Sequence, residues 1–183
     1  MALQGVAGHQ DTLVPSLRCI PISNSVFPKT LDADFIAPNA VVVGDVKMGA
    51  GSSAWHGTTL RGDTASIEIG KNSVIQDNSH IASHAREAGD KISIGDNVYV
   101  GCNVKLQPCE LESFSYVGMG ASIGNGCTVE SFAVVAAGAQ VPDGTTVPSG
   151  QIYAGTPARY LRDLSQQEKH LIGEHHFDMQ QLA

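Results

Sequence analysis

An aliphatic side chain recurs every six residues along most of this chain, from position 36 to position 147. The period restarts at positions 69, 94 and 111, and 17 of its 18 positions hold Ile, Leu, Val or Met. The positions are Ile36, Val42, Met48, Ala54, Leu60, Ile69, Ile75, Ile81, Ile94, Val100, Leu106, Leu111, Val117, Ile123, Val129, Val135, Val141 and Val147. A period of six fits neither an α-helix, which repeats every 3.6 residues, nor a half-exposed strand, which repeats every two. It predicts a triangular coil in which each side is a short strand and three sides make one turn.

The same spacing predicts how the coil is stabilised. The aliphatic residue of each side points inward, a small residue two places earlier fills the corner, and Gly follows at many sharp turns. Because one turn cannot bury its own core, stability comes from stacking each turn on the next. Extra residues interrupt the period within 62–66 and within 83–90. We expect both segments to be loops pushed out of the coil, where contacts and function are commonly found.

The two ends of the chain lack the period. Residues 1–34 contain three prolines and several apolar residues, which predicts an extended N-terminal arm that docks on this molecule or a neighbour. The coil is expected over 35–153, and a turn and a helix over 154–183. Ser165 followed by Glu168 has the spacing of a capping box, so the helix should begin near residue 166 and run to about 181. Its apolar residues, Leu171 and Ile172 among them, share a face that can lie against the coil.

Composition excludes some classes of partner. The net charge is −7 and no cluster of Lys or Arg occurs, which argues against nucleic acid. No apolar run reaches the roughly 18 residues that a membrane span needs, so we expect membrane association only through other proteins. The four cysteines form no CxxC pair, which favours a reducing compartment. Residues 1–34 have only two basic residues, which is not typical of a mitochondrial presequence.

Several short motifs follow one another in an order that resembles γ-class carbonic anhydrases. They are Ile36-Ala37-Pro38, Val43-Gly44-Asp45-Val46, Leu60-Arg61-Gly62-Asp63, Ile75-Gln76-Asp77-Asn78, Ile94-Gly95-Asp96-Asn97, Val117-Gly118-Met119-Gly120-Ala121 and Gly155-Thr156-Pro157-Ala158-Arg159. The resemblance covers about residues 35–170. It implies an all-β fold, a left-handed parallel β-helix of hexapeptide repeats with a C-terminal α-helix packed alongside. It also implies a trimer with Arg61, Asp63, Gln76 and Asp77 at the subunit interface.

The resemblance further implies where a zinc site would lie. Members of the family bind zinc with three histidines at the boundary between two subunits, two from one subunit and one from its neighbour. Here the three positions hold Ala82, Cys102 and Gln107. Alanine cannot coordinate a metal, and a neutral amide is a poor zinc ligand. We therefore expect no metal, no cofactor and no catalytic residue in this chain.

A chain that keeps the repeat and the motifs of the family but lacks its three zinc-binding histidines is expected to be a non-catalytic structural subunit. Residues 149–155, which precede the Thr156-Pro157-Ala158-Arg159 motif, resemble the corresponding segment of the γ-carbonic anhydrase subunits of mitochondrial complex I. On that resemblance we expect a heterotrimer with γ-carbonic anhydrase paralogues. It would lie on the matrix side of the inner membrane, as a peripheral module against the membrane-arm subunits of complex I, and would support assembly of that arm.

Two enzymatic alternatives stay open at this stage. A metal-dependent carbonic anhydrase or hydratase could use relocated ligands, drawn from His80, His84 and Cys102. A hexapeptide-repeat acyltransferase would need a catalytic histidine, and His56 and His80 are the histidines within the period. Stoichiometric zinc with carbon dioxide hydration would support the first, and binding of acetyl-coenzyme A would support the second.

Overall fold

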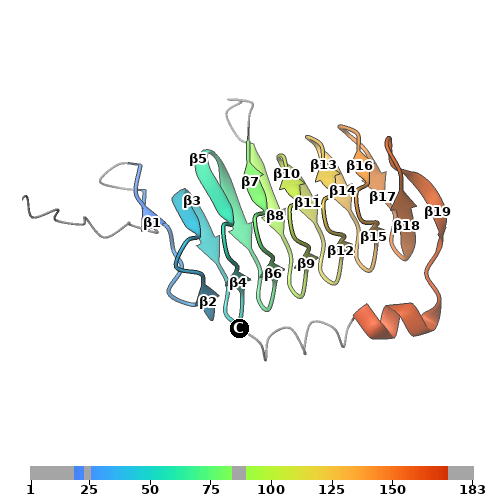
Figure 1. Ribbon diagram of the computed structural model, residues 1–183, viewed down its shortest axis with the longest axis horizontal. Helices are drawn as coiled ribbons and strands as arrows, with labels where there is room; N and C mark the ends of the chain where they lie inside the picture. The colour runs from blue at the N-terminus through green and yellow to red at the C-terminus, as the bar shows by residue number, and fades with distance from the viewer. Residues whose placement is uncertain (1–18, 23–25, 84–89, 173–183) are drawn as a thin grey trace, which may run out of the picture.

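The computed structural model describes residues 19–22, 26–83 and 90–172, and these form a triangular coil of about six turns. Figure 1 shows the turns stacked side by side from β2 at one end to β18 at the other. Apart from β1 and β19, every strand pairs in parallel with the strand one turn away, as the period of six predicts. The predicted all-β, hexapeptide-repeat coil with a C-terminal helix is confirmed.

The strands lie on three faces. The first face holds β2 (Phe35–Ile36), β4 (Ser53–Ala54), β6 (Val74–Ile75), β9 (Tyr99–Val100), β12 (Tyr116–Val117), β15 (Val134–Val135) and β18 (Gln151–Ala154). The second face holds β7 (His80–Ala82), β10 (Lys105–Leu106), β13 (Ser122–Ile123) and β16 (Gln140–Val141). The third face holds β8 (Lys91–Ile94), β11 (Cys109–Leu111), β14 (Cys127–Val129) and β17 (Thr146–Val147). Two longer strands, β3 (Val41–Met48) and β5 (Thr59–Ile69), run across both the second and the third face, which joins these faces into one sheet.

Three edges separate the faces, and each is named here by one residue. The Cys102 edge, between the first and second faces, comprises residues 37–40, 55–58, 76–79, 101–104, 118–121 and 136–139. The Gln107 edge, between the second and third faces, comprises residues 43–45, 61–66, 82–83, 107–108, 124–126 and 142–144. The Phe114 edge, between the third and first faces, comprises residues 49–52, 70–73, 95–98, 112–115, 130–133 and 148–150.

The core is the column of inward-facing residues that the period of six predicts. Val42, Leu60 and Ile81 are fully buried, as are their counterparts in later turns. Ile36 is only partly buried because it lies in the first turn, at the open end of the coil. The small residues two places earlier, such as Ser79, are buried in the corners. Stacking therefore removes almost the whole apolar column from water, which is the main stabilising term.

The prediction of a loop within 62–66 is wrong, because these residues continue β5 in extended form. The ladder between β3 and β5 slips after the pair Gly44 and Gly62, so the extra residues are absorbed as a bulge. Thr64 Oγ1 donates to the carbonyl of Ser83 at 3.0 Å, which ties this bulge to the next turn. Of the second predicted loop, 84–89 lies outside the described residues.

Strand β1 (Cys19–Ile20) belongs to the predicted arm and pairs in parallel with Val42 and Val43 of β3. Lys29 adds a bridge to the same strand through the amide and carbonyl of its backbone. These parts of the arm therefore lie on the first turn of their own molecule. Ile22 and Phe27 stay about half exposed there, while residues 1–18 lie outside the described part.

After the last turn the chain reverses and forms β19 (Arg159–Asp163), an antiparallel strand against β18 that the sequence did not predict. A helix follows over residues 166–172, beside the lower edge of the coil in Figure 1. Its capping box is confirmed: Ser165 N donates to Glu168 Oε2 at 2.9 Å, and Glu168 N donates to Ser165 Oγ at 3.2 Å. Ile172 is buried, whereas Leu171 is 59% exposed. The helix predicted beyond residue 172 lies outside the described residues.

Candidate functional site: two edges of the second face

Two of the three positions that the resemblance assigns to zinc ligands lie side by side. Leu106 pairs with Ile81 in the ladder between β10 and β7, so the residues that follow, Gln107 and Ala82, are neighbours on consecutive turns. Both lie at the Gln107 edge, where Ala82 is buried and Gln107 is half-buried. Arg61 continues the same column one turn earlier, because it pairs with Ala82.

The third position, Cys102, lies at the opposite edge of the second face. Its carbonyl accepts the amide of Gly120 at 2.8 Å, and the amide of the next residue, Asn103, donates to the carbonyl of Asp77 at 2.8 Å. Cys102 is therefore the counterpart of Asp77 one turn on, at the Cys102 edge. The fold divides the three positions into a pair and a single residue, the same division between two subunits that the resemblance implies.

The four residues expected at the trimer interface are divided between the same two edges. Arg61 and Asp63 form an ion pair at the Gln107 edge, with Nη2 and Oδ2 2.6 Å apart. This contact lowers the pKa of Asp63 and raises that of Arg61. Gln76 and Asp77 lie at the Cys102 edge, so within one chain the structure does not bring them to Arg61.

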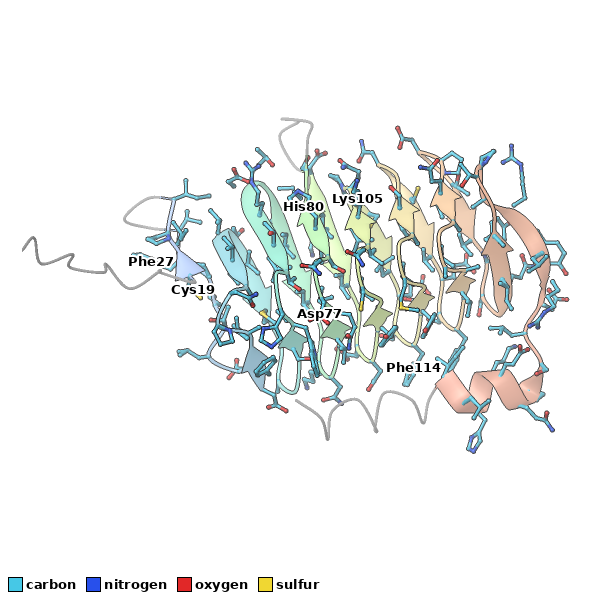
Figure 2. All side chains as sticks on the ribbon, in the orientation of Figure 1. Cys19, Phe27, Asp77, His80, Lys105 and Phe114 are labelled. Carbon is cyan, nitrogen blue, oxygen red and sulfur yellow. The ribbon has the colours of Figure 1, made fainter. Side chains whose placement is uncertain are left out.

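Between the two edges, the second face presents a polar outer column. The residues that point outward from its strands are Val41, Thr59, His80, Lys105, Ser122 and Gln140, and all but Val41 are polar. Figure 2 shows His80 and Lys105 next to each other on this face. Asp77 lies at the Cys102 edge of the same face.

Gln76, which the resemblance assigns to the trimer interface, is buried within its own chain. Its side chain is 6% exposed, and its Nε2 has no hydrogen-bond partner among the described residues. The other end of the amide, Oε1, accepts a weak hydrogen bond from Cys102 Sγ at 3.7 Å.

A stacked tyrosine pair lies close to the Cys102 thiol. The rings of Tyr99 and Tyr116 occupy the same position on consecutive turns, with centroids 4.7 Å apart. Burial, with a smaller contribution from the neighbouring Tyr116, raises the pKa of Tyr99 to about 12. Both phenols therefore stay neutral at physiological pH, and they leave the Cys102 edge without an added charge.

Sequence reasoning also missed a hydrogen-bond network around His56. Its backbone amide donates to Asp77 Oδ1 at 2.9 Å, and its Nδ1 lies 2.9 Å from Asn39 Oδ1. The same Asn39 oxygen accepts from the amide of Gly57 at 3.2 Å. Asp77 is thus held by its own molecule, and its carboxylate stabilises a corner of the coil. The signal that could have revealed this network is that His56 and Asp77 occupy the same position on consecutive turns, with Asn39 one place further along in the turn before.

The described residues do not fit a zinc ion in the family's manner. Ala82 has no donor atom, and Gln107 offers only a neutral amide. Among the residues that the structure describes, no group of three or more His, Cys, Asp and Glu side chains could hold a metal. Of the relocated ligands considered above, His80 lies on the second face, Cys102 lies at its edge, and His84 lies outside the described part. A site built from these three residues stays untested.

The geometry so far defines a hexapeptide-repeat coil protein, and comparison with solved structures agrees. A hexapeptide transferase family protein from Anaplasma phagocytophilum matches with a TM-score of 0.83 and 33% identity, over 90% of this chain and 95% of its own. A protein from Bacillus cereus described as a putative acetyltransferase matches with a TM-score of 0.82 and 27% identity, over 89% of this chain and 92% of its own. No family model matches the chain.

Proteins of similar sequence identify the family within this fold class. A probable carbonic anhydrase of Methanocaldococcus jannaschii is 43% identical over 76% of this chain and 86% of its own length. Gamma carbonic anhydrase 3, mitochondrial, of Arabidopsis thaliana is 45% identical over 79% of this chain. Gamma carbonic anhydrase-like 2, mitochondrial, of the same plant is 40% identical over 82% of it. The chain belongs to the γ-carbonic anhydrase family.

The alignment with the plant relatives is partial on their side. The chain spans 58% of gamma carbonic anhydrase 3 and 60% of gamma carbonic anhydrase-like 2. In the part of the chain that the structure describes, no helix is both long enough and apolar enough to cross a membrane.

Proposed function

We propose that this chain is a structural γ-carbonic anhydrase-like subunit of a heterotrimer and carries no complete zinc site of its own. The observation that supports this most is the pair Ala82 and Gln107. They are neighbours at one edge, where the family would supply two histidines, and neither is a suitable ligand. The surrounding coil keeps its core and its ladders, so the residues at these two positions affect metal binding and not folding.

We place this heterotrimer in mitochondria, at the matrix side of the inner membrane, as part of the carbonic anhydrase module of respiratory complex I. Support comes from the relatives at 40% identity or more, several of which are named as mitochondrial proteins. The proposed partners are γ-carbonic anhydrase paralogues and membrane-arm subunits of complex I. The chain itself transfers no electron and supports assembly of the arm.

The test is the composition of the native assembly. The chain would be tagged at its natural locus, extracted in mild detergent and analysed by native mass spectrometry and peptide sequencing. We expect a trimer with γ-carbonic anhydrase paralogues, together with subunits of the NADH dehydrogenase. Recovery of a free homotrimer of this chain alone would contradict the proposal.

A matched pair of variants tests the edge that would contact a paralogue. Replacing Arg61 with Ala removes the ion pair with Asp63 and should reduce recovery of the mixed trimer. Replacing Lys47 with Ala removes an ion pair with Glu68 on the third face, outside both of these edges, and should leave recovery unchanged. Equal recovery of the two variants would argue that the Gln107 edge is not an interface.

A further inference from the structure

The N-terminal end of the coil exposes apolar side chains that the proposed heterotrimer does not explain. Of the nine large apolar side chains that are exposed among the described residues, four lie between positions 20 and 31: Ile20, Ile22, Phe27 and Leu31. Figure 2 shows Phe27 at this end of the coil, as is Cys19 of β1. The first turn of a stacked coil has no turn before it, and an exposed apolar cluster marks a surface that another molecule covers.

The backbone at this end is open as well. β1 pairs with β3 on one side, and no described strand pairs with its other side. Figure 1 shows β1 as the outermost strand of the stack. A free strand edge presents N–H and C=O groups that a second strand can bind. The end therefore offers directional hydrogen bonds in addition to apolar area.

Charges of both signs accompany these apolar side chains. Lys29, Asp32 and Asp34 are exposed, and none of them forms an ion pair with another described residue. At the opposite end of the coil, by contrast, Arg162 of β19 is already paired with Glu168. A surface with free charges of both signs is complementary to a copy of itself, because a two-fold axis can place the positive group of each chain opposite a negative group of the other.

We propose that two copies of this chain associate through their N-terminal ends. The contact is isologous: β1 pairs with β1 of the second copy, and Phe27 and Leu31 are buried between the two ends. Lys29 of each copy faces Asp32 of the other. The contact uses the end of the coil and leaves the Cys102 and Gln107 edges of the later turns free. It therefore goes beyond the proposed heterotrimer and does not depend on it.

The charges favour a second copy over a lipid surface as the cover. Anionic headgroups attract Lys and Arg, whereas this end exposes two carboxylates for one ammonium group. Residues 1–18, which precede β1 in the chain, are the remaining candidate. A cover supplied by the same chain would leave the mass of the protein unchanged, so the mass distinguishes the two.

The experiment measures the mass of the full chain, expressed alone, by sedimentation velocity over a series of concentrations. Two variants each reverse one charge, Lys29→Asp and Asp32→Lys, and a third, Phe27→Asp, places a charge in the apolar area. The matched control is Leu161→Asp on β19, because Leu161 is 59% exposed and Phe27 is 55% exposed. Circular dichroism confirms that each variant is folded.

Wild type and Leu161→Asp should have twice the mass of Phe27→Asp, whether the unit that doubles is one chain or three. Each charge reversal should weaken the association at least about tenfold, because it places like charges opposite each other. An equimolar mixture of Lys29→Asp and Asp32→Lys should restore the association, since the negative end of one variant then meets the positive end of the other. The double variant with both reversals should associate by itself, as wild type does.

A wild-type mass that does not exceed that of Phe27→Asp overturns this inference and assigns the cover to residues 1–18. Charge-reversed variants that associate as tightly as wild type, or whose mixture does not associate, also overturn it, because the ends then do not meet as proposed. The composition of the native assembly is measured separately. The heterotrimer and the contact between N-terminal ends can therefore fail independently of each other.

Discussion

At the scale of single residues, the coil depends on corners that only certain side chains tolerate. Positive φ angles recur at the edges, and most of these positions hold Gly or Asn. Phe114 and Phe132 are the departures, with φ of 64° and 56°, and their rings stack in parallel with centroids 5.0 Å apart. Figure 2 shows Phe114 at the lower edge of the coil, near the helix. Stacking and burial offset the strain that a bulky residue meets in this conformation.

Asn78 provides a test of corner strain without such compensation. It is exposed at the Cys102 edge and has a φ of 54°. Because a β-branched residue is poorly accommodated at this φ, Asn78→Val should lower the free energy of unfolding by about 1–2 kcal/mol. Asn78→Gly should leave it nearly unchanged, since Gly adopts positive φ without strain. Denaturant unfolding measures both, and equal stability of the two variants would exclude strain as the determinant of this corner.

A second pair of variants separates strain from close packing. A Cβ at Gly118 would lie 2.5 Å from the backbone nitrogen of Ala137, whereas a Cβ at Gly120 would meet nothing within 4 Å. Gly120→Ala should cost about 1 kcal/mol, from its φ of 70° alone. Gly118→Ala should cost more, about 2–3 kcal/mol, because the next turn must move. Circular dichroism during urea unfolding would show this order, and the reverse order would contradict the predicted spacing of the turns.

At the scale of elements, side chains tie together strands that the chain reaches in different turns. Glu68 on β5 binds Lys47 of β3 at 2.8 Å and also forms an ion pair with Lys91 of β8. One carboxylate thus bridges three neighbouring strands of the third face. Hydrogen bonds from both lysines lower the pKa of Glu68 to about 2.

This bridge predicts a specific dependence of stability on pH. The pKa of Glu68 in the fold lies below the ordinary value of 4.5, so its ionised form stabilises the fold above that pH. The contribution should decline as pH falls from about 4.5 toward 2. It should stay below about 1 kcal/mol, because these side chains are more than a third exposed and solvent screens them.

The measurement compares the unfolding free energies of wild type and Glu68→Gln across this pH range. The gap between them should be largest near neutral pH, close as pH approaches 2, and shrink with added salt. Glu110→Gln, which alters an exposed carboxylate of β11 on the same face, is the matched control. A gap that is independent of pH would mean that the bridge does not form in solution.

At the scale of the whole molecule, the second face lies between two chemically different edges. One edge presents the Arg61–Asp63 pair with Ala82 and Gln107, and the other presents Cys102 with Gln76. A three-fold assembly would bring the first edge of one chain against the second edge of the next. Because the two edges differ, each boundary between subunits would join two unlike surfaces. The three interfaces of a mixed trimer would therefore not be equivalent.

Restoring the three ligand positions tests whether their loss alone removed zinc binding. The triple variant Ala82→His, Cys102→His and Gln107→His should bind zinc stoichiometrically as a homotrimer, since the frame around these positions is intact. The double variant without Ala82→His should bind little. Metal analysis after gel filtration makes the comparison. Equal zinc in the double and triple variants would show that position 82 is not a ligand position.

The period of six was enough to predict the coil, because the inward position of each side repeats without regard to what the edges carry. It did not predict β19 or the extended course of 62–66. Those depend on a chain reversal after the last turn and on a slip in the ladder at Gly44. Both features are set by contacts between segments distant in sequence, which a periodic pattern does not encode.

The candidate site was predicted only in part, because contacts between turns also determine where its residues lie. The resemblance identified positions 82, 102 and 107, and the ladder then placed two of them together and one apart. The burial of Gln76 could not be read from spacing, because it depends on how residues of the neighbouring turn, such as Cys102, pack around it. The distribution of Arg61 and Gln76 over separate edges likewise becomes visible only when the turns are stacked.

The separation of inward and edge positions has a consequence for how such proteins diverge. In each turn the residue that fills the core and the residue that could hold a metal are different positions of the same period, as Ile81 and Ala82 illustrate. A gene copy can therefore lose its chemistry by drift at the edges while selection on folding continues to act on the core. The same independence means that a few codon changes separate an architectural member of the lineage from a catalytic one.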